Sequence, residues 1–151
     1  MKKIEISFDH RGVDLARKIK DYVTLMGYDV CMGESKDGDD YIDNALPAIS
    51  RIKNKKSNFG ILICGTGVGM AIVANRIDGI FAVHATDAAQ AYFARKHENA
   101  NVLALGAGYK DDNYEVKLSF PKAKAIIDAF LNTEFDGGRH KRRISKIDNI
   151  V

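Results

Sequence analysis

The chain has 151 residues, of which 46% are hydrophobic and 28% charged, and this composition excludes a disordered or fibrous protein. The length suits one core, so we expect a single domain over residues 1–151. No apolar stretch approaches the roughly 20 residues that span a bilayer, and Glu5 interrupts the first apolar run, which argues against a signal peptide or membrane anchor. Two cysteines make no secreted disulfide framework, so we expect a cytoplasmic protein without a membrane partner.

The formal net charge is only +3, but basic residues gather near the C-terminus in the segment Arg139-His140-Lys141-Arg142-Arg143. Such a cluster indicates a phosphate ligand, another anionic partner or a solvated helix face. A nucleic-acid surface would need more basic residues with aromatic side chains between them. We therefore expect no nucleic-acid partner.

Hydrophobic patterning along the chain predicts strands that alternate with helices. Residues 3–8 are predicted as a strand, and residues 13–26 carry apolar side chains at helical spacing until Gly27 ends the pattern. Residues 59–64 are almost continuously apolar, as in a parallel strand buried on both faces. The other predicted elements are strand 29–32, helix 42–54 with Pro47 in its first turns, helix 70–75, strand 80–84, helix 88–96, strand 102–105 and helix 114–132.

This alternation favours an α/β fold, namely a doubly wound, Rossmann-like parallel sheet of about five strands with helices on both faces. No linker or repeat divides the sequence. After Gly137 and Gly138, the residues Ile144, Ile147 and Val151 recur at helical spacing, which predicts an amphipathic C-terminal helix over about residues 139–151. Its apolar stripe could pack on its own core or on a partner.

Chemically useful side chains follow the predicted strands, and ligands of open parallel sheets bind beyond the carboxyl ends of the strands. Asp9 and His10 follow the first strand, and Cys64 ends the third. His97 lies between the fourth helix and the fifth strand, where a histidine could also simply cap the helix. We expect these residues to form one site.

The segment Gly65-Thr66-Gly67-Val68-Gly69 joins the third strand to a helix. It lacks the third glycine of a dinucleotide fingerprint, because Met70 stands there, and it has no P-loop lysine. Its backbone N–H groups could instead converge on an enediolate or a carboxylate at the positive end of the helix.

Cys64 stands at the same helix start, which stabilises a thiolate, so it could act as a base. The alternative is that Cys64 is an inert small hydrophobe like most strand cysteines, and we place Cys31 in that class. No CxxC or HExxH motif occurs, and we expect no metal site.

Several motifs occur in a fixed order along nearly the whole chain: Asp9-His10, residues 60–69 (GILICGTGVG), Ala74-Asn75-Arg76, Asn101-Val102-Leu103-Ala104 and Gly137-Gly138-Arg139-His140. Together they resemble the type B ribose-5-phosphate isomerase family, which also includes galactose-6-phosphate and allose-6-phosphate isomerases. The CGTGVG segment is the most specific element. The resemblance implies interconversion of ribose 5-phosphate and ribulose 5-phosphate through a cis-enediolate, in the pentose phosphate pathway, without a metal or organic cofactor.

The resemblance also implies roles for individual residues. Cys64 matches the family's catalytic thiol and would move the proton between C1 and C2, while backbone N–H groups of residues 65–69 hold the oxyanion. His97, with help from Asp9 and Thr66, would open the furanose ring. The implied substrate ligands are His10, Tyr41, Gly65, Gly67, Val68, Gly69, Asn99, Arg139 and Arg143.

A second implication concerns assembly. The family resemblance suggests a homodimer, or a tetramer of such dimers, in which Cys64 and His10 of one subunit face His97 of the other. Arg139 and Arg143 would lie beside that His97, and their i, i+4 spacing places both guanidinium groups on one helical face, where they suit a phosphate.

Three positions depart from the family pattern. Glu98 stands where many relatives have asparagine, and Asn99 could take its place. Gly108 stands where several relatives have a phosphate-binding arginine, so phosphate binding is expected to be weaker or helped by Lys110. Ile42 replaces the usual proline after Tyr41.

Two alternatives stay open: a hexose 6-phosphate (allose or galactose) isomerase, and a non-catalytic sugar-phosphate sensor. The loops 33–40 and 109–113 would decide between five- and six-carbon substrates.

Overall fold

The computed structural model describes residues 1–150, and the helices and strands alternate for most of this length. In chain order they are β1 (Lys3–Phe8), α1 (Val13–Leu25), β2 (Asp29–Met32), α2 (Tyr41–Lys53), β3 (Phe59–Cys64), α3 (Val68–Asn75), β4 (Ala82–His84), α4 (Ala88–Glu98), β5 (Val102–Gly106), β6 (Gly108–Lys110), β7 (Glu115–Lys117), α5 (Phe120–Leu131) and α6 (Gly138–Ile147).

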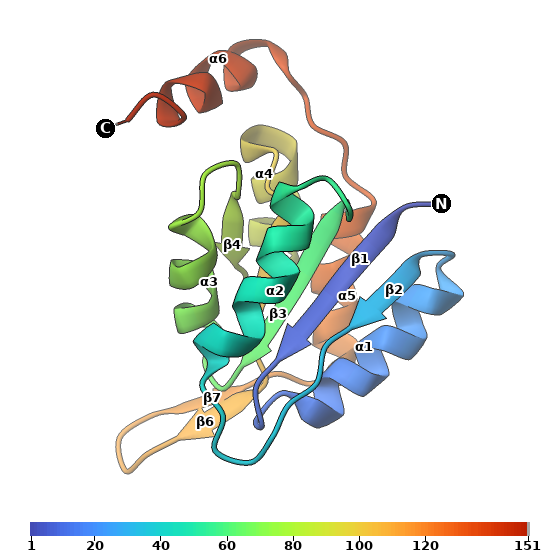
Figure 1. The fold of residues 1–151 in the computed structure, drawn as a ribbon, viewed down its shortest axis with the longest axis vertical. Helices are drawn as coiled ribbons and strands as arrows, with labels where there is room; N and C mark the ends of the chain where they lie inside the picture. The colour runs from blue at the N-terminus through green and yellow to red at the C-terminus, as the bar shows by residue number, and fades with distance from the viewer. Residues whose placement is uncertain (151) are drawn as a thin grey trace.

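The main sheet has five strands in the order β2-β1-β3-β5-β4, and every neighbouring pair is parallel. Figure 1 shows α2 and α3 in front of this sheet and α1, α4 and α5 behind it. The predicted fold class, a doubly wound α/β sheet with helices on both faces, is confirmed.

Two hydrophobic cores hold the layers together, one on each face of the sheet. The larger core joins α1, α4 and α5 to the sheet, and the smaller core joins α2 and α3 to it. Every residue of β3 is buried, as its continuous apolar sequence predicts. Cys64, the last residue of β3, belongs to the smaller core and faces α2 and α3.

After β1 the chain adds β2 at one edge of the sheet. It then returns to place β3 on the other side of β1, and β5 and β4 extend the sheet from there. The carboxyl ends of β1 and β3 therefore flank the topological switch point, where open α/β sheets bind ligands. A hydrogen bond from the Asp9 N–H to the Ile63 carbonyl, 3.1 Å long, holds the two strand ends together.

The prediction of one helix over residues 114–132 is wrong in its first part. Residues 115–117 form β7, which pairs antiparallel with β6 in a hairpin outside the main sheet. Asp111 closes the hairpin turn by accepting hydrogen bonds from the N–H groups of Asn113 (2.8 Å) and Tyr114 (2.9 Å). Helix α5 begins only after Ser119, whose side chain caps the N–H of Lys122.

Two other predicted helices differ in detail. Pro47 lies in the middle of α2, with its ring exposed, and the helix continues through it. The predicted C-terminal helix is present as α6, which packs against α4. Ile144 is buried within the chain and Ile147 is 46% exposed, whereas Val151 lies outside the described residues.

No helix within residues 1–150 is long and apolar enough to cross a membrane.

Candidate active site

The loop after β1 brings Asp9 to the switch point of the sheet. Asp9 is only 6% exposed, and its carboxylate accepts a hydrogen bond from the N–H of Arg11 at 2.9 Å. Its backbone carbonyl accepts another from Gly12 at 3.0 Å. These bonds fix the loop tightly, so the Asp9 carboxylate keeps a defined position at the carboxyl end of the sheet.

Cys64 lies beside Asp9 in a cavity of about 330 Å³ whose walls also include Tyr41 and Thr66. The thiol is nearly buried, and its Sγ accepts a hydrogen bond from the N–H of Gly67 at 3.2 Å. The thiol is therefore held by a backbone donor at the wall of a pocket, a placement that an inert core cysteine would not need.

The glycine-rich segment wraps around this sulfur because Gly67 adopts a left-handed conformation, with φ of 81°. A Cβ at this position would stand 2.8 Å from the N atom of Gly106 and 2.7 Å from the His84 ring, so no other residue fits. Thr66 accepts a hydrogen bond from the N–H of Val68 at 3.3 Å. Burial lowers the pKa of His84, while a backbone hydrogen bond with Thr66 acts in the other direction.

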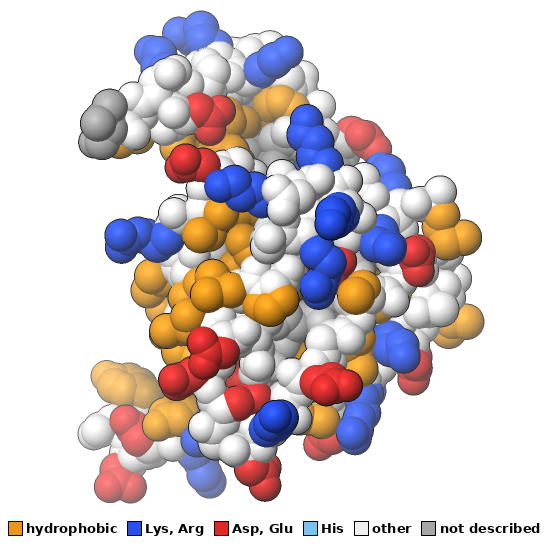
Figure 2. All heavy atoms as spheres, in the orientation of Figure 1, with side chains coloured by type: hydrophobic (Ala, Val, Ile, Leu, Met, Phe, Trp, Pro, Cys, Tyr) orange, Lys and Arg blue, Asp and Glu red, His pale blue; other side chains and the backbone are white. Residues whose placement is uncertain are grey.

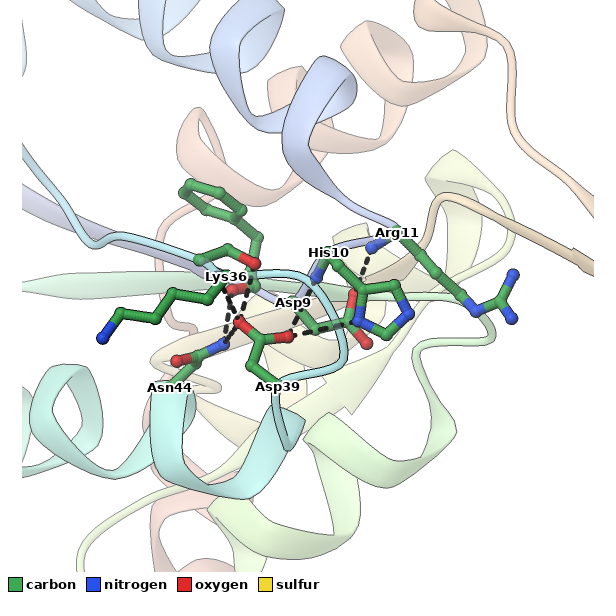
Figure 3. Close-up of polar contacts among 8 residues, drawn as sticks. Asp9, His10, Arg11, Lys36, Asp39 and Asn44 are labelled. Carbon is green, nitrogen blue, oxygen red and sulfur yellow. Dashed lines mark hydrogen bonds and ion pairs between the residues drawn. The ribbon is translucent and has the colours of Figure 1, made fainter.

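His10 points out of the same loop and is oriented by Asp39 (Figure 3). The Asp39 carboxylate accepts bonds from the backbone N–H of His10 at 3.1 Å and from its Nδ1 at 3.2 Å. Because a carboxylate can only accept, Nδ1 carries the proton and Nε2 is left for a ligand. No motif in the sequence marks Asp39, although it lies in the polar loop 33–40.

Asp39 is itself held by donors from three directions, Ser35 (2.7 Å), the N–H of Lys36 (2.9 Å) and Asn44 (2.6 Å). Burial alone would raise the pKa of Asp39, but these hydrogen bonds and that from His10 outweigh it and hold the pKa well below the usual range. Asp39 is therefore ionised at neutral pH.

Tyr41, the first residue of α2, lines the Cys64 cavity despite the missing proline after it. Its ring packs against Gly69, where an added Cβ would come within 2.6 Å of the ring. Tyr41, Gly65, Val68 and Gly69 thus share one pocket with Cys64, as predicted.

His97 does not share the Cys64 pocket within one chain, so the one site expected for these residues would have to be shared between two subunits, as the family resemblance implies. Helix α4 runs back against the parallel strands, so its last turn lies near the amino ends of β5 and β3, while Cys64 pairs with Gly106 at their carboxyl ends. In Figure 1, α4 and α6 meet at one end of the molecule and the β6–β7 hairpin marks the other.

The predicted residues His97, Asn99, Arg139 and Arg143 gather at that far end, together with His140. We call these five residues the His97 cluster. The rings of His97 and His140 stack in parallel, with centroids 4.1 Å apart and an interplanar angle of 8°. Asn99 ends α4 in a left-handed conformation, and its side chain accepts a hydrogen bond from Arg95 at 3.2 Å.

One group of possible metal ligands occurs in the described part of the chain, formed by His97, Asp136 and His140, whose ligand atoms lie within 4.8 Å of one another. Ring nitrogens bind a metal along lone pairs in the ring plane, and parallel stacked rings do not aim these lone pairs at one point, as a tetrahedral ion requires. Burial, then His97, Arg139 and Arg143, lower the pKa of His140, and the two guanidinium groups also oppose a metal ion. The geometry fits a stacked pair better than a metal centre.

Comparison with known proteins gives a consistent result over nearly the whole chain. The model of the family described as Ribose/Galactose Isomerase matches residues 4–147. A probable ribose-5-phosphate isomerase B from Mycoplasma genitalium is 38% identical over 148 residues, which cover 95% of this chain and 92% of that protein.

Solved structures agree with this match. A ribose 5-phosphate isomerase from Thermotoga maritima superposes with a TM-score of 0.89 at 40% identity, covering 99% of each chain. The Mycoplasma genitalium enzyme with bound ribulose-5-phosphate gives a TM-score of 0.86 at 35% identity, covering 97% of this chain and 94% of that one.

Proposed function

Because the chain belongs to the ribose/galactose isomerase family, we propose that it interconverts D-ribose 5-phosphate and D-ribulose 5-phosphate as a step of the pentose phosphate pathway, with Cys64 as the base. The observation that carries this proposal is the nearly buried Cys64 thiol, which receives the Gly67 N–H and faces a pocket beside Asp9. The two cysteines are free thiols, which suits a reducing compartment, and the proposal places the reaction in the cytoplasm.

In the proposed reaction the Cys64 thiolate removes the proton from C2 of the open-chain aldose. The electron pair of that C–H bond forms the C1–C2 double bond as the π pair of the C1 carbonyl moves onto O1, which gives a cis-enediolate. The hydroxyl proton on O2 then passes to the neighbouring O1, the electron pair left on O2 forms the C2 carbonyl, and the C1–C2 π pair takes the proton back from the thiol onto C1. Backbone N–H groups of residues 65–69 hold the negative oxygen. Met70, the residue after the last glycine, carries no acid–base group that could replace Cys64 as the base, and the proposal needs no metal or organic cofactor.

Ring opening requires a second group, and the proposal assigns it to His97 of a partner subunit. Within one chain His97 lies at the opposite end of the sheet from Cys64, so it cannot serve the same pocket. A two-fold homodimer, alone or paired into a tetramer, would bring Cys64 and His10 of one subunit to the His97 cluster of the other. The substrate phosphate would then meet His10 from one side and Arg139 and Arg143 from the other.

The surface around the Cys64 pocket supports such an interface. Figure 2 shows hydrophobic side chains gathered over α2 and α3. Val68 and Ile72 line the rim of the pocket and are 47% and 60% exposed, and Ile42 and Leu46 on α2 are 41% and 42% exposed. An apolar rim beside a catalytic pocket suits contact with a second subunit.

Complementation tests the shared site directly. We expect Cys64→Ala and the double variant Arg139→Ala, Arg143→Ala each to be inactive, and their mixture to regain roughly a quarter of wild-type activity after subunit exchange, because half the dimers are mixed and each mixed dimer has one intact site. No regain of activity, with exchange verified by mass spectrometry, would reject the shared site.

The substrate is tested by comparing initial rates with ribose 5-phosphate, allose 6-phosphate and galactose 6-phosphate. The proposal expects the highest kcat/KM with ribose 5-phosphate. A higher value with either hexose phosphate would replace the proposed substrate, and no turnover with any of them would indicate a binding protein.

A further inference from the structure

Arg11 carries a guanidinium without a hydrogen-bond or ion-pair partner among residues 1–150. Its backbone N–H is held by Asp9 at 2.9 Å, but its side chain makes only a cation–π contact, with the guanidinium carbon 4.5 Å from the ring centroid of Tyr109. Tyr109 belongs to β6 of the hairpin. The loop at the base of Arg11 is therefore rigid while its charged end is open to a ligand.

The side chain of Arg11 lies at the boundary of two cavities. It lines the Cys64 cavity of about 330 Å³ and a second cavity, of about 610 Å³, beneath the hairpin, and Tyr109 lines both as well. The Arg11 stem passes directly over the residue after Cys64, since a Cβ added to Gly65 would stand 2.9 Å from Arg11 Cδ and 3.3 Å from the Tyr109 ring. Arg11 and Cys64 thus line the same cavity.

The contact with Tyr109 leaves the hydrogen-bond donors of the Arg11 guanidinium free. A cation–π contact uses the face of the planar group and leaves its N–H donors, which point outward in the plane, free to bind oxygens in pairs. In Figure 3 the His10 ring and the Arg11 side chain extend from the loop in the same direction, with Arg11 reaching farther. An anion in front of His10 would meet both residues.

The subunit that carries Cys64 needs a positively charged side chain of its own to bind the substrate phosphate. Arg139 and Arg143 lie at the far end of the sheet, and Gly108 stands next to Tyr109 without a charged side chain. On the subunit that carries Cys64, a phosphate of charge near −2 would otherwise meet His10 and, on the hairpin, Lys110, but no guanidinium. We propose that Arg11, held on Tyr109, is a phosphate-binding residue of this chain, which gives the Cys64 side of the site its own guanidinium. This inference rests on the proposed isomerase function for the identity of the sugar phosphate.

The test compares Arg11→Gln with Arg17→Gln, which removes the same charge from an exposed position on α1. For Arg11→Gln we expect KM for ribose 5-phosphate to rise about ten- to a hundredfold, the loss expected for a charge-assisted pair, with a smaller change in kcat. Arg11→Lys keeps the charge but loses the paired donors, so its KM should lie between those of the wild type and Arg11→Gln. Arg17→Gln should match the wild type.

Binding of inorganic phosphate, measured by calorimetry, provides a readout that is independent of turnover. We expect Arg11→Gln to weaken it about tenfold or more relative to Arg17→Gln. Equal phosphate affinities of these two variants, or a fall in kcat without a change in KM, would overturn the role of Arg11. A wild-type protein that binds phosphate through Arg11 but isomerises no sugar phosphate would refute the proposed function and still support the phosphate contact.

Discussion

Replacing Asp39 by asparagine should damage both the stability of the protein and the orientation of His10. The two carboxylate oxygens of Asp39 accept five hydrogen bonds: those from His10 reach Oδ1, and those from Ser35, Lys36 and Asn44 reach Oδ2. In the Asp39→Asn variant an NH₂ group takes the place of one oxygen and faces donors instead of accepting from them.

The size of the effect follows from which donors can adapt. The Ser35 hydroxyl and the Asn44 amide can turn to offer an acceptor, but the Lys36 N–H cannot. Each hydrogen bond to an ionised group contributes about 1.5–3 kcal/mol, so losing the Lys36 bond and weakening one other should cost about 3 kcal/mol. For a domain of this size that corresponds to a Tm lower by about 6–12 °C. The Asp39 side chain is only 13% exposed, so solvent replaces little of this loss.

The effect should also depend on pH with a definite sign. The pKa of Asp39 is lowered in the folded protein from its usual 3.8, so its contribution is fully present above that value and is lost as pH falls toward the folded-state pKa. The difference in unfolding free energy between wild type and Asp39→Asn should therefore be largest at neutral pH and should shrink below about pH 3.8.

Urea unfolding at pH 7 and at pH 3, at equal protein concentration, measures this difference. Asp37→Asn is the control, because Asp37 lies in the same loop and is exposed. If Asp39→Asn and Asp37→Asn unfold at the same urea concentration at pH 7, the hydrogen bonds around Asp39 contribute nothing and the reasoning fails.

Three other changes have defined outcomes. Cys64→Ala should abolish isomerisation while calorimetry still detects ribose 5-phosphate, because the base is lost and the phosphate ligands stay; a kcat above roughly a tenth of the wild-type value would contradict this. Prolonged EDTA treatment should leave the rate unchanged, since backbone N–H groups stabilise the enediolate; loss of activity that zinc or manganese restores would refute this. Gly69→Ala should raise KM roughly tenfold, because the new Cβ would displace the Tyr41 ring, and an unchanged KM would remove Tyr41 from the substrate site.

The main sheet could be predicted from the sequence because a parallel strand buried on both faces has a continuous apolar signature. The bounds 59–64 of β3 are those predicted. The β6–β7 hairpin could not be predicted in this way, since β7 is three exposed residues long and forms only by pairing with β6. A local signal did mark the true start of α5, namely Ser119 as N-cap followed by Pro121, but apolar periodicity extended the prediction past it.

The Cys64 pocket could also be predicted from the sequence, because residues that directly follow neighbouring parallel strands meet at one edge of the sheet. His97 ends a helix, and a crossover helix runs against the strands it connects, so within one chain its C-terminus lies at the other edge of the sheet. Asp39 was missed for a different reason. Its importance comes from donors that the fold collects from three segments of the chain, and no spacing in the sequence reveals that.

The β6–β7 hairpin is a segment in which the sequence can vary without disturbing the fold. It lies outside the five-stranded sheet, and its β7 residues are exposed, so substitutions there leave both cores untouched. Yet Tyr109 on its first strand forms part of the wall of the Cys64 cavity. Sequence and length variation in residues 108–117 can therefore reshape the pocket at little cost in folding, which makes this segment the natural target of a library that selects for a longer or shorter sugar phosphate.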